Sequence, residues 1–141
     1  MFLQLAIATA MVLLTVTIHG GGLAVFGRAL RLESRQEAAS HIPPLSPRTL
    51  IFTLMLVLAL FVLHGVEIWL YATLYLALGA IGNLETAVFL STIAYGGNGF
   101  NDIYLLHSWR LLAAIECING VLLLGWSTAF FVTVLARLGG R

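Results

Sequence analysis

The sequence predicts an all-α integral membrane protein with three transmembrane helices and one short helix between the second and the third. Of its 141 residues, 60% are hydrophobic and only 9% are charged, whereas a soluble domain has about 25% charged residues. Three apolar runs each reach the ~20 residues that a helix needs to cross a bilayer. A fourth apolar run, residues 84–95, is too short to cross. We therefore exclude a water-soluble globular domain.

The first predicted transmembrane helix covers residues 1–27. It contains His19, which is followed by three glycines, Gly20 to Gly22, that allow close approach of another helix. We expect His19 to hydrogen-bond between helices. Residues 1–4 carry no charged side chain, so we expect a retained helix rather than a cleaved signal peptide, which usually begins with positive charge.

A polar linker, residues 28–48, separates the first helix from the second. It holds four of the seven arginines and all three prolines, which lie between Pro43 and Pro47. Prolines interrupt a helix, although the Arg-rich first half can extend the first helix along the membrane surface. The second predicted helix, residues 49–72, is apolar except for His64 and Glu67. Trp69, Tyr71 and Tyr75 cluster near its end, as in an aromatic belt at a membrane surface.

The third long helix is predicted over residues 109–138. Two arginines, Arg137 and Arg141, follow its apolar part, and only Arg110 lies between the second and third long helices. The positive-inside rule places Arg-rich segments in the cytoplasm. We therefore expect insertion in the cytoplasmic membrane with the N-terminus outside and the C-terminus inside.

Residues 76–108 then begin and end outside the cell. A helix over residues 84–95 starts after Asn83, which is a preferred capping residue, and carries Glu85 in its first turn. It spans only about half a bilayer. The glycine-rich segment 96–102 follows, and such a backbone is tolerated at membrane depth only inside protein or beside water. The sequence thus predicts a re-entrant half-helix with an extended return.

Residues 49–138 resemble the pore domain of the potassium-channel superfamily, in the form of small bacterial members with an extra N-terminal helix. The family motif T-x-T-T-V-G-Y-G-D aligns without gaps with residues 94–102, which read Ala-Tyr-Gly-Gly-Asn-Gly-Phe-Asn-Asp. The run 84–91 matches the pore helix. Downstream, residues 109–112 and the run 125–129, with Glu116, Asn119 and Gly120 between them, resemble the inner helix.

The resemblance implies a homotetrameric pore that conducts monovalent cations passively. It implies an outer helix over 49–72, a pore helix over 84–95, a selectivity filter over 96–102 and an inner helix over 109–138. The filter residues would be Gly96, Gly97, Asn98, Gly99, Phe100, Asn101 and Asp102. A potassium filter depends on stacked backbone carbonyls. Gly97, Asn98 and Asn101 stand where the family has Thr, Val and Gly, so we do not expect strict K⁺ selectivity.

Four polar residues of the long helices, His64, Glu67, Glu116 and Asn119, are predicted to support the filter or to sense pH, and direct ion binding by Glu116 stays open. His64 and Glu67 are three residues apart and share a helix face. Ionisable residues inside a span point to function by default. By the resemblance, Gly120 and Gly125 are candidate hinge residues of the inner helix.

Two other classes of function stay open. One is a non-conducting accessory subunit that keeps the pore fold. The other is a haem-binding subunit with His19 and His64 as axial ligands, although counting along the helices puts these residues at different depths. We expect no enzyme activity, no bound metal or cofactor apart from permeant K⁺ or Na⁺, and no nucleic-acid or soluble-domain partner. The partners would be membrane lipid and further copies of the chain.

Overall fold

The computed structural model describes residues 1–40, 47–99 and 107–139, and every element in this part of the chain is helical. The elements are α1 (Phe2–Ser40), α2 (Pro47–Ala77), α3 (Leu84–Tyr95), the 3₁₀ helix η1 (His107–Trp109) and α4 (Arg110–Gly139). By length and composition, α1, α2 and α4 can each cross a membrane. The predicted all-helical fold with three helices long and apolar enough to cross a membrane is confirmed for the described residues, and it is consistent with an integral membrane protein.

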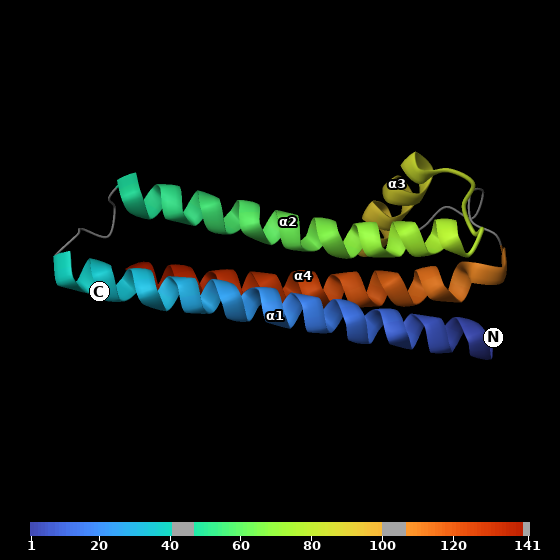
Figure 1. The fold of residues 1–141 in the computed structure, drawn as a ribbon, viewed down its shortest axis with the longest axis horizontal. Coiled ribbons are helices and arrows are strands. Elements are labelled where there is room, and N and C mark those ends of the chain that lie inside the picture. Colours follow the sequence, from blue (N-terminus) through green and yellow to red (C-terminus); the bar gives the residue numbers. More distant parts are fainter. Residues whose placement is uncertain (41–46, 100–106, 140–141) are drawn as a thin grey trace.

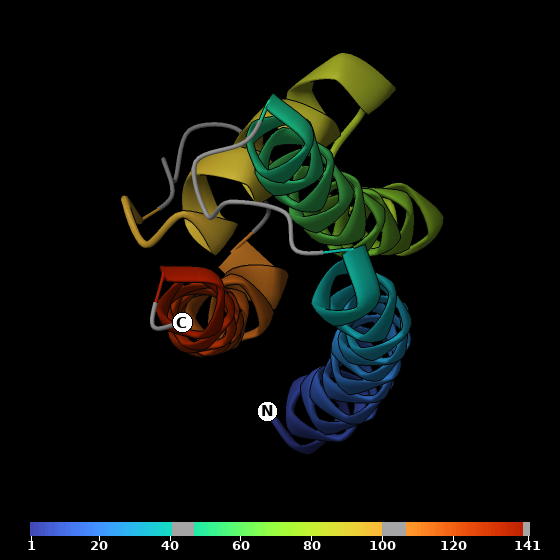
Figure 2. The same cartoon turned by 90° about the vertical axis from the view of Figure 1, so that its left-hand side faces the viewer.

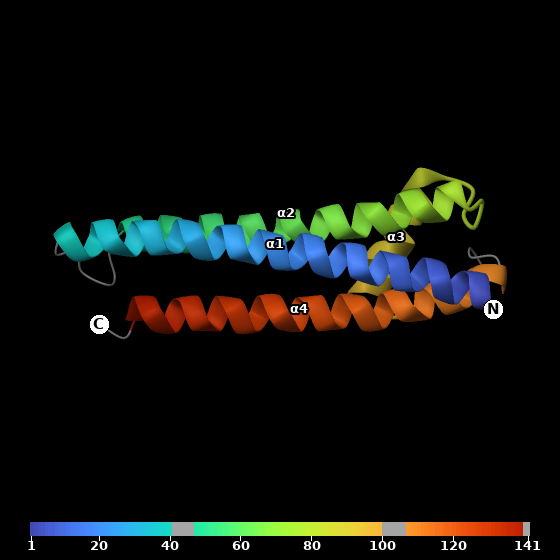
Figure 3. The same cartoon turned by 60° about the horizontal axis from the view of Figure 1, so that its bottom comes forward.

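The three long helices form an elongated bundle (Figures 1 and 3). Helices α1 and α4 run in the same direction, and α2 runs against both. The start of α1, the end of α2 and the start of α4 lie at one end of the bundle, together with α3. This agrees with the relative topology that the sequence predicts. Which end faces the cytoplasm stays a prediction from the arginine distribution.

The helix boundaries differ from the predicted ones mainly at the linker. Helix α1 continues to Ser40, past the predicted end at residue 27, so the Arg-rich part of the linker extends the helix. Helix α2 begins at Pro47 and ends at Ala77. Proline is well tolerated at the first helical position because that position needs no N–H donor. Helix α3 has the predicted boundaries.

Helix α3 is capped at both ends by its own sequence. The Asn83 side chain accepts a hydrogen bond from the Thr86 N–H (2.8 Å). At the other end, the Gly97 N–H donates to the Ala94 carbonyl (2.9 Å) and the Asn98 N–H donates to the Ile93 carbonyl (3.0 Å). With Gly97 at φ +78°, this pair of bonds is a Schellman cap, which favours glycine.

The Schellman cap corrects one prediction. The extended return was expected to begin at residue 96, but residues 96–98 form the turn that ends α3. Glycine at position 97 allows this turn, since a left-handed backbone strains other residues. Phe100, Asn101 and Asp102 lie outside the described residues.

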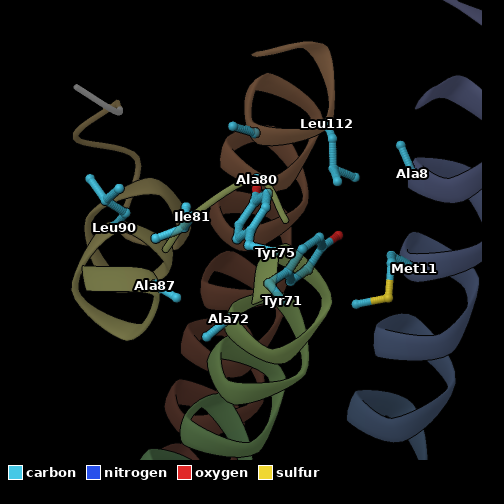
Figure 4. Close-up of a cluster of buried hydrophobic side chains, with 11 residues drawn as sticks. Ala8, Met11, Tyr71, Ala72, Tyr75, Ala80, Ile81, Ala87, Leu90 and Leu112 are labelled. Atoms are coloured by element: carbon cyan, nitrogen blue, oxygen red, sulfur yellow. The ribbon is translucent and has the colours of Figure 1, made fainter. Parts of the chain in front are cut away.

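Helix α3 packs on α2 and α4, on the side away from α1 (Figure 2). The core at this end of the bundle combines side chains of all four helices (Figure 4). Tyr71 and Tyr75 are part of that core and are almost fully buried, so the aromatic-belt interpretation is wrong for these two residues. Trp69, which is 51% exposed, stays compatible with it.

Much of the bundle surface is apolar. Phe61 is 73% exposed, Val62 68% and Leu122 66%. Large apolar side chains exposed in such numbers are unusual for a soluble monomer. They suit contact with lipid or with other membrane-embedded protein.

Glycine 120 allows α4 to approach the end of α3. A Cβ atom at this position would lie 2.2 Å from the Tyr95 carbonyl oxygen, which belongs to the backbone and cannot rotate away. A Cβ at Gly125 would meet nothing within 4 Å. Helix α4 is continuous through both positions. The structure thus gives Gly120 a packing role, and a hinge role for either glycine stays a prediction.

We predict that Gly120→Ala destabilises the protein by about 1–3 kcal/mol, because α3 and α4 must separate to admit the methyl group. Gly125→Ala is the matched control on the same helix and should be neutral or stabilising by up to about 1 kcal/mol. The free energy of unfolding in mixed micelles, measured by titration with sodium dodecyl sulfate, tests both. Equal effects of the two variants would contradict the close approach.

Candidate functional site

A cluster of buried polar side chains joins all four helices behind the turn at residues 96–99. We call it the polar cluster. Its members are Thr15 and His19 of α1; His64, Glu67, Tyr71 and Tyr75 of α2; Ser91 and Tyr95 of α3; and Glu116, Asn119 and Ser127 of α4. Buried polar groups are costly unless they are hydrogen-bonded, and here they bond to one another.

Regular spacing places these residues on the inner faces of their helices. On α2, residues 64, 67, 71 and 75 follow one another at intervals of three or four. On α4, residues 116, 119 and 127 fall on a similar stripe, with the buried Leu123 between the last two. Thr15 and His19 are four apart on α1. Residues three or four apart share a helix face, so each helix presents one polar stripe to the others.

Glu67 is the centre of the first part of the cluster. Its carboxylate lies 3.0 Å from Nδ1 of His19 and accepts a short hydrogen bond from the Tyr95 hydroxyl. His64 Nδ1 lies 3.4 Å from the second carboxylate oxygen and 2.9 Å from the Tyr95 hydroxyl. The fully buried Glu67 side chain thereby links α1, α2 and the last residue of α3.

His19 extends this network to α4. Its second ring nitrogen, Nε2, lies 3.2 Å from the Ser127 hydroxyl. His19 is fully buried, and its ring packs against those of His64 and Trp126, with centroid distances of 5.1 and 5.5 Å. A Cβ at Gly20 would come within 3.1 Å of Trp126. The predicted role of His19 in bonding between helices is confirmed, and glycine beside it allows the close packing.

Glu116 is the centre of the second part. Its two carboxylate oxygens accept hydrogen bonds from Tyr75 of α2 and Ser91 of α3, each 2.5 Å long. The Ser91 hydroxyl also lies 3.0 Å from the Ile68 carbonyl. Glu116 is fully buried. A carboxylate from α4 thus ties α3 to α2 at a second point, one helical turn before Tyr95.

Asn119 joins α4 to the other two long helices. Its side-chain amide donates to the Thr15 hydroxyl (2.8 Å) and to the Tyr71 hydroxyl (3.2 Å). It makes no described hydrogen bond to α3. Asn119 therefore supports the bundle, and any support of the turn is indirect.

The depth of the turn follows from the contact between Gly120 and Tyr95. Gly120 is ten residues after Arg110, the first residue of α4, which is about 15 Å along the helix. The span Arg110–Ala136 is long and apolar enough to cross a membrane, and the turn packs beside the middle part of this helix rather than at its end. Gly96, Gly97 and Asn98 are exposed there, and a Cβ at Gly97 would come within 2.7 Å of a Val121 methyl group.

The two carboxylates stand out in the sequence, whereas most of their hydrogen-bond partners do not. Hydrogen bonds or contacts from His64, Glu67 and Glu116 reach α3 as expected. Tyr71, Tyr75 and Tyr95 were not singled out as site residues. The i, i+3, i+7 pattern of polar side chains on α2 is a signal that would have found the first two.

The prediction that the two histidines lie at different depths is wrong. His19 and His64 were expected at different levels, but their rings are in contact. The levels were counted from predicted span ends, whereas α1 and α2 continue past those ends to Ser40 and Ala77. The arrangement does not suit a haem held between two imidazoles, because the rings pack on each other and both face Glu67.

Among the residues that the structure describes, one group has the composition and spacing of a metal-binding set. His19, His64 and Glu67 each offer a ligand atom, and these atoms lie within 4.8 Å of one another.

Comparisons with protein families, with curated proteins and with solved structures found no significant match to this chain.

We predict that position 116 tolerates glutamine but not leucine. The amide of Glu116→Gln can accept from Tyr75 and donate to Ser91, whose hydroxyl then donates to the Ile68 carbonyl. Glu116→Leu leaves the Tyr75 hydroxyl buried without its acceptor, at a cost of about 1–3 kcal/mol. Unfolding titrations in mixed micelles compare the variants. A leucine variant as stable as the glutamine variant would show that these hydrogen bonds contribute little.

Proposed function

We propose that this chain is one subunit of a passive pore for monovalent cations in the cytoplasmic membrane, with its N-terminus outside. The observation that carries the proposal is the turn at residues 96–98, which is exposed and lies about 15 Å along α4. The N–H groups of residues 96–98 are hydrogen-bonded within the turn, but irregular backbone of this kind is excluded from lipid and tolerated only against protein or water. In a single copy, α1 and α2 do not cover this turn (Figure 2).

Further copies of the chain supply the missing cover. One copy contributes one short helix and one glycine-rich segment, which cannot enclose a path. The resemblance to the potassium-channel superfamily implies four copies around an axis. The exposed apolar side chains of α4, such as Ile118 (64%) and Val121 (51%), suit contact with neighbouring copies or the wall of a pore.

The polar cluster would hold the pore segment in place. Glu67 and Glu116 bond to Tyr95 and Ser91 in the last two turns of α3, so the long helices determine where the segment begins. Filter support is therefore the role we propose for His64, Glu67 and Glu116. A pH-sensing role for His64 remains part of the same proposal, since this residue contacts both Glu67 and Tyr95.

Weak discrimination between K⁺ and Na⁺ is expected from the same segment. Gly97 closes a helix-ending turn and has no hydroxyl group, so it cannot supply the ring of threonine hydroxyls that the family uses. The further roles of Phe100, Asn101 and Asp102 rest on the resemblance alone.

A non-conducting pore-like subunit is the second candidate. The Schellman cap favours this second candidate. The backbone of residues 96–98 forms a turn, so its carbonyl groups do not form the extended row of a potassium filter. Both candidates assemble as the same tetramer, but only the pore subunit passes K⁺ and Na⁺.

We predict that the purified protein is a tetramer in mild detergent and passes both K⁺ and Na⁺ in liposomes. Light scattering gives the mass, and separate K⁺, Na⁺ and Ca²⁺ flux assays give the selectivity. A monomer or dimer would contradict the assembly. A tetramer without flux would favour the accessory subunit, and a reversal potential set by K⁺ alone would contradict the weak selectivity.

We also predict that position 98 lines the path. In a Cys117→Ser background, Asn98→Cys should lose most of its flux after reaction with a charged methanethiosulfonate reagent, and K⁺ should slow the reaction. Glu85→Cys, at the exposed start of α3, is the matched control and should react without loss of flux. Unchanged flux in the modified Asn98→Cys protein would remove residues 96–99 from the path.

A further inference from the structure

His19 and His64 lie 45 positions apart in the sequence and meet at Glu67 in the structure. His19 Nδ1 is 3.0 Å from one Glu67 oxygen, and His64 Nδ1 is 3.4 Å from the other. Two imidazole nitrogens and a carboxylate are the ligand types that zinc and similar transition metals take in proteins.

We propose that His19, His64 and Glu67 form a binding site for a divalent transition metal of the Zn²⁺ class. Ligand atoms about 2.0–2.2 Å from a tetrahedral zinc ion are separated from each other by roughly 3.3 Å. The distances of 3.0 and 3.4 Å from the two imidazoles to the Glu67 carboxylate are close to this separation. These two distances run to different oxygens of Glu67, and the three ligand atoms lie within 4.8 Å of one another, so the widest pair has to close by up to about 1.5 Å to surround an ion.

The neighbours of these three residues complete the arrangement. A histidine that binds metal through one ring nitrogen donates its other N–H to an oxygen that fixes the ring. His19 has the Ser127 hydroxyl 3.2 Å from Nε2, so the neutral tautomer with hydrogen on Nε2 donates to Ser127 and frees Nδ1 for the metal. The Tyr95 hydroxyl, which bonds to Glu67, lies 2.9 Å from His64 Nδ1 and borders the remaining position.

Burial and charge favour a dication at this place. His19 and Glu67 are fully buried, and the His64 side chain, 13% exposed, forms the open side. One carboxylate and two imidazoles in their neutral, metal-binding form would carry a net charge of −1, which attracts a dication and lowers the net charge of the occupied site to +1. Calcium and magnesium prefer six or more oxygen ligands or several retained waters, so the two nitrogens select against them.

The site adjoins the segment that the pore proposal concerns, but the inference does not depend on that proposal. Tyr95 is the last residue of α3 and is followed directly by Gly96. A metal on Glu67 and both histidines would hold α1 and α2 together behind this residue. Metal binding can be measured whether or not the protein conducts.

The test uses untagged, full-length protein in detergent, with Zn²⁺ or Co²⁺ added. We expect Zn²⁺ to raise the unfolding temperature, and Co²⁺ to give the visible absorption of a tetrahedral site. His19→Gln, His64→Gln and Glu67→Gln should each weaken binding by about 100-fold or more, and Ser127→Ala by about 10–100-fold, as for other second-layer partners. Cys117→Ser, which removes the chain's only thiol, is the matched control and should bind like the wild type.

Absence of Zn²⁺ and Co²⁺ binding by the wild-type protein would overturn the proposal, as would unchanged binding in the two histidine variants. X-ray absorption of the Zn²⁺-loaded wild type decides the question even if variants fail to fold. Two imidazoles with oxygen ligands at about 2.0–2.2 Å support the site, whereas sulfur at about 2.3 Å would assign the metal to Cys117 and overturn it. A wild-type protein that binds Zn²⁺ but passes neither K⁺ nor Na⁺ would contradict the pore proposal and leave the metal site intact.

Discussion

The need to satisfy two buried carboxylates governs the architecture of this protein. Glu67 and Glu116 are fully buried in a bundle with an apolar surface, and an unpaired carboxylate in such surroundings is very costly. Each takes a hydroxyl hydrogen bond from α3, through Tyr95 and Ser91, and further partners from another long helix. Because both carboxylates take partners from other helices in addition to any on their own, the short helix is held where both meet it. The position of α3 is thus a consequence of hydrogen-bond satisfaction as much as of apolar packing.

Glycine determines how closely the short helix approaches the bundle. Gly120 lets the Tyr95 backbone rest on α4, and Gly97 allows the left-handed turn that ends α3 beside Val121. Side chains at these positions would push the turn outward and lengthen the hydrogen bonds to Ser91 and Tyr95. The polar cluster and the glycines therefore both determine the distance between α3 and the long helices. The polar cluster holds α3 by hydrogen bonds, and the glycines leave room for the close approach. Our pore proposal rests on the exposed backbone that results.

The proposed metal site would give Glu67 a second way to be satisfied. With the hydrogen bonds described, it accepts from Tyr95 and faces both imidazoles. With a metal ion, the same oxygens and the imidazole nitrogens would become ligands, and Ser127 would accept the displaced N–H of His19. Exchange between the two arrangements would change how firmly Tyr95 is held, and with it the start of the segment 96–99. Metal binding and the proposed conduction would then be linked through the hydroxyl group of Tyr95.

The sequence by itself determined the membrane class, the three spans and the boundaries of α3, since apolar length and capping residues act locally. It also singled out Glu67, Glu116 and His64, because ionisable residues stand out in an apolar run. Only the tertiary structure decided that His19 meets His64, because their relative level depends on how far α1 and α2 extend past their apolar parts. It likewise moved Tyr71 and Tyr75 from the membrane surface to the core and ended α3 in a turn. Which partner a buried polar group finds depends on helix packing, which residue spacing within one helix does not specify.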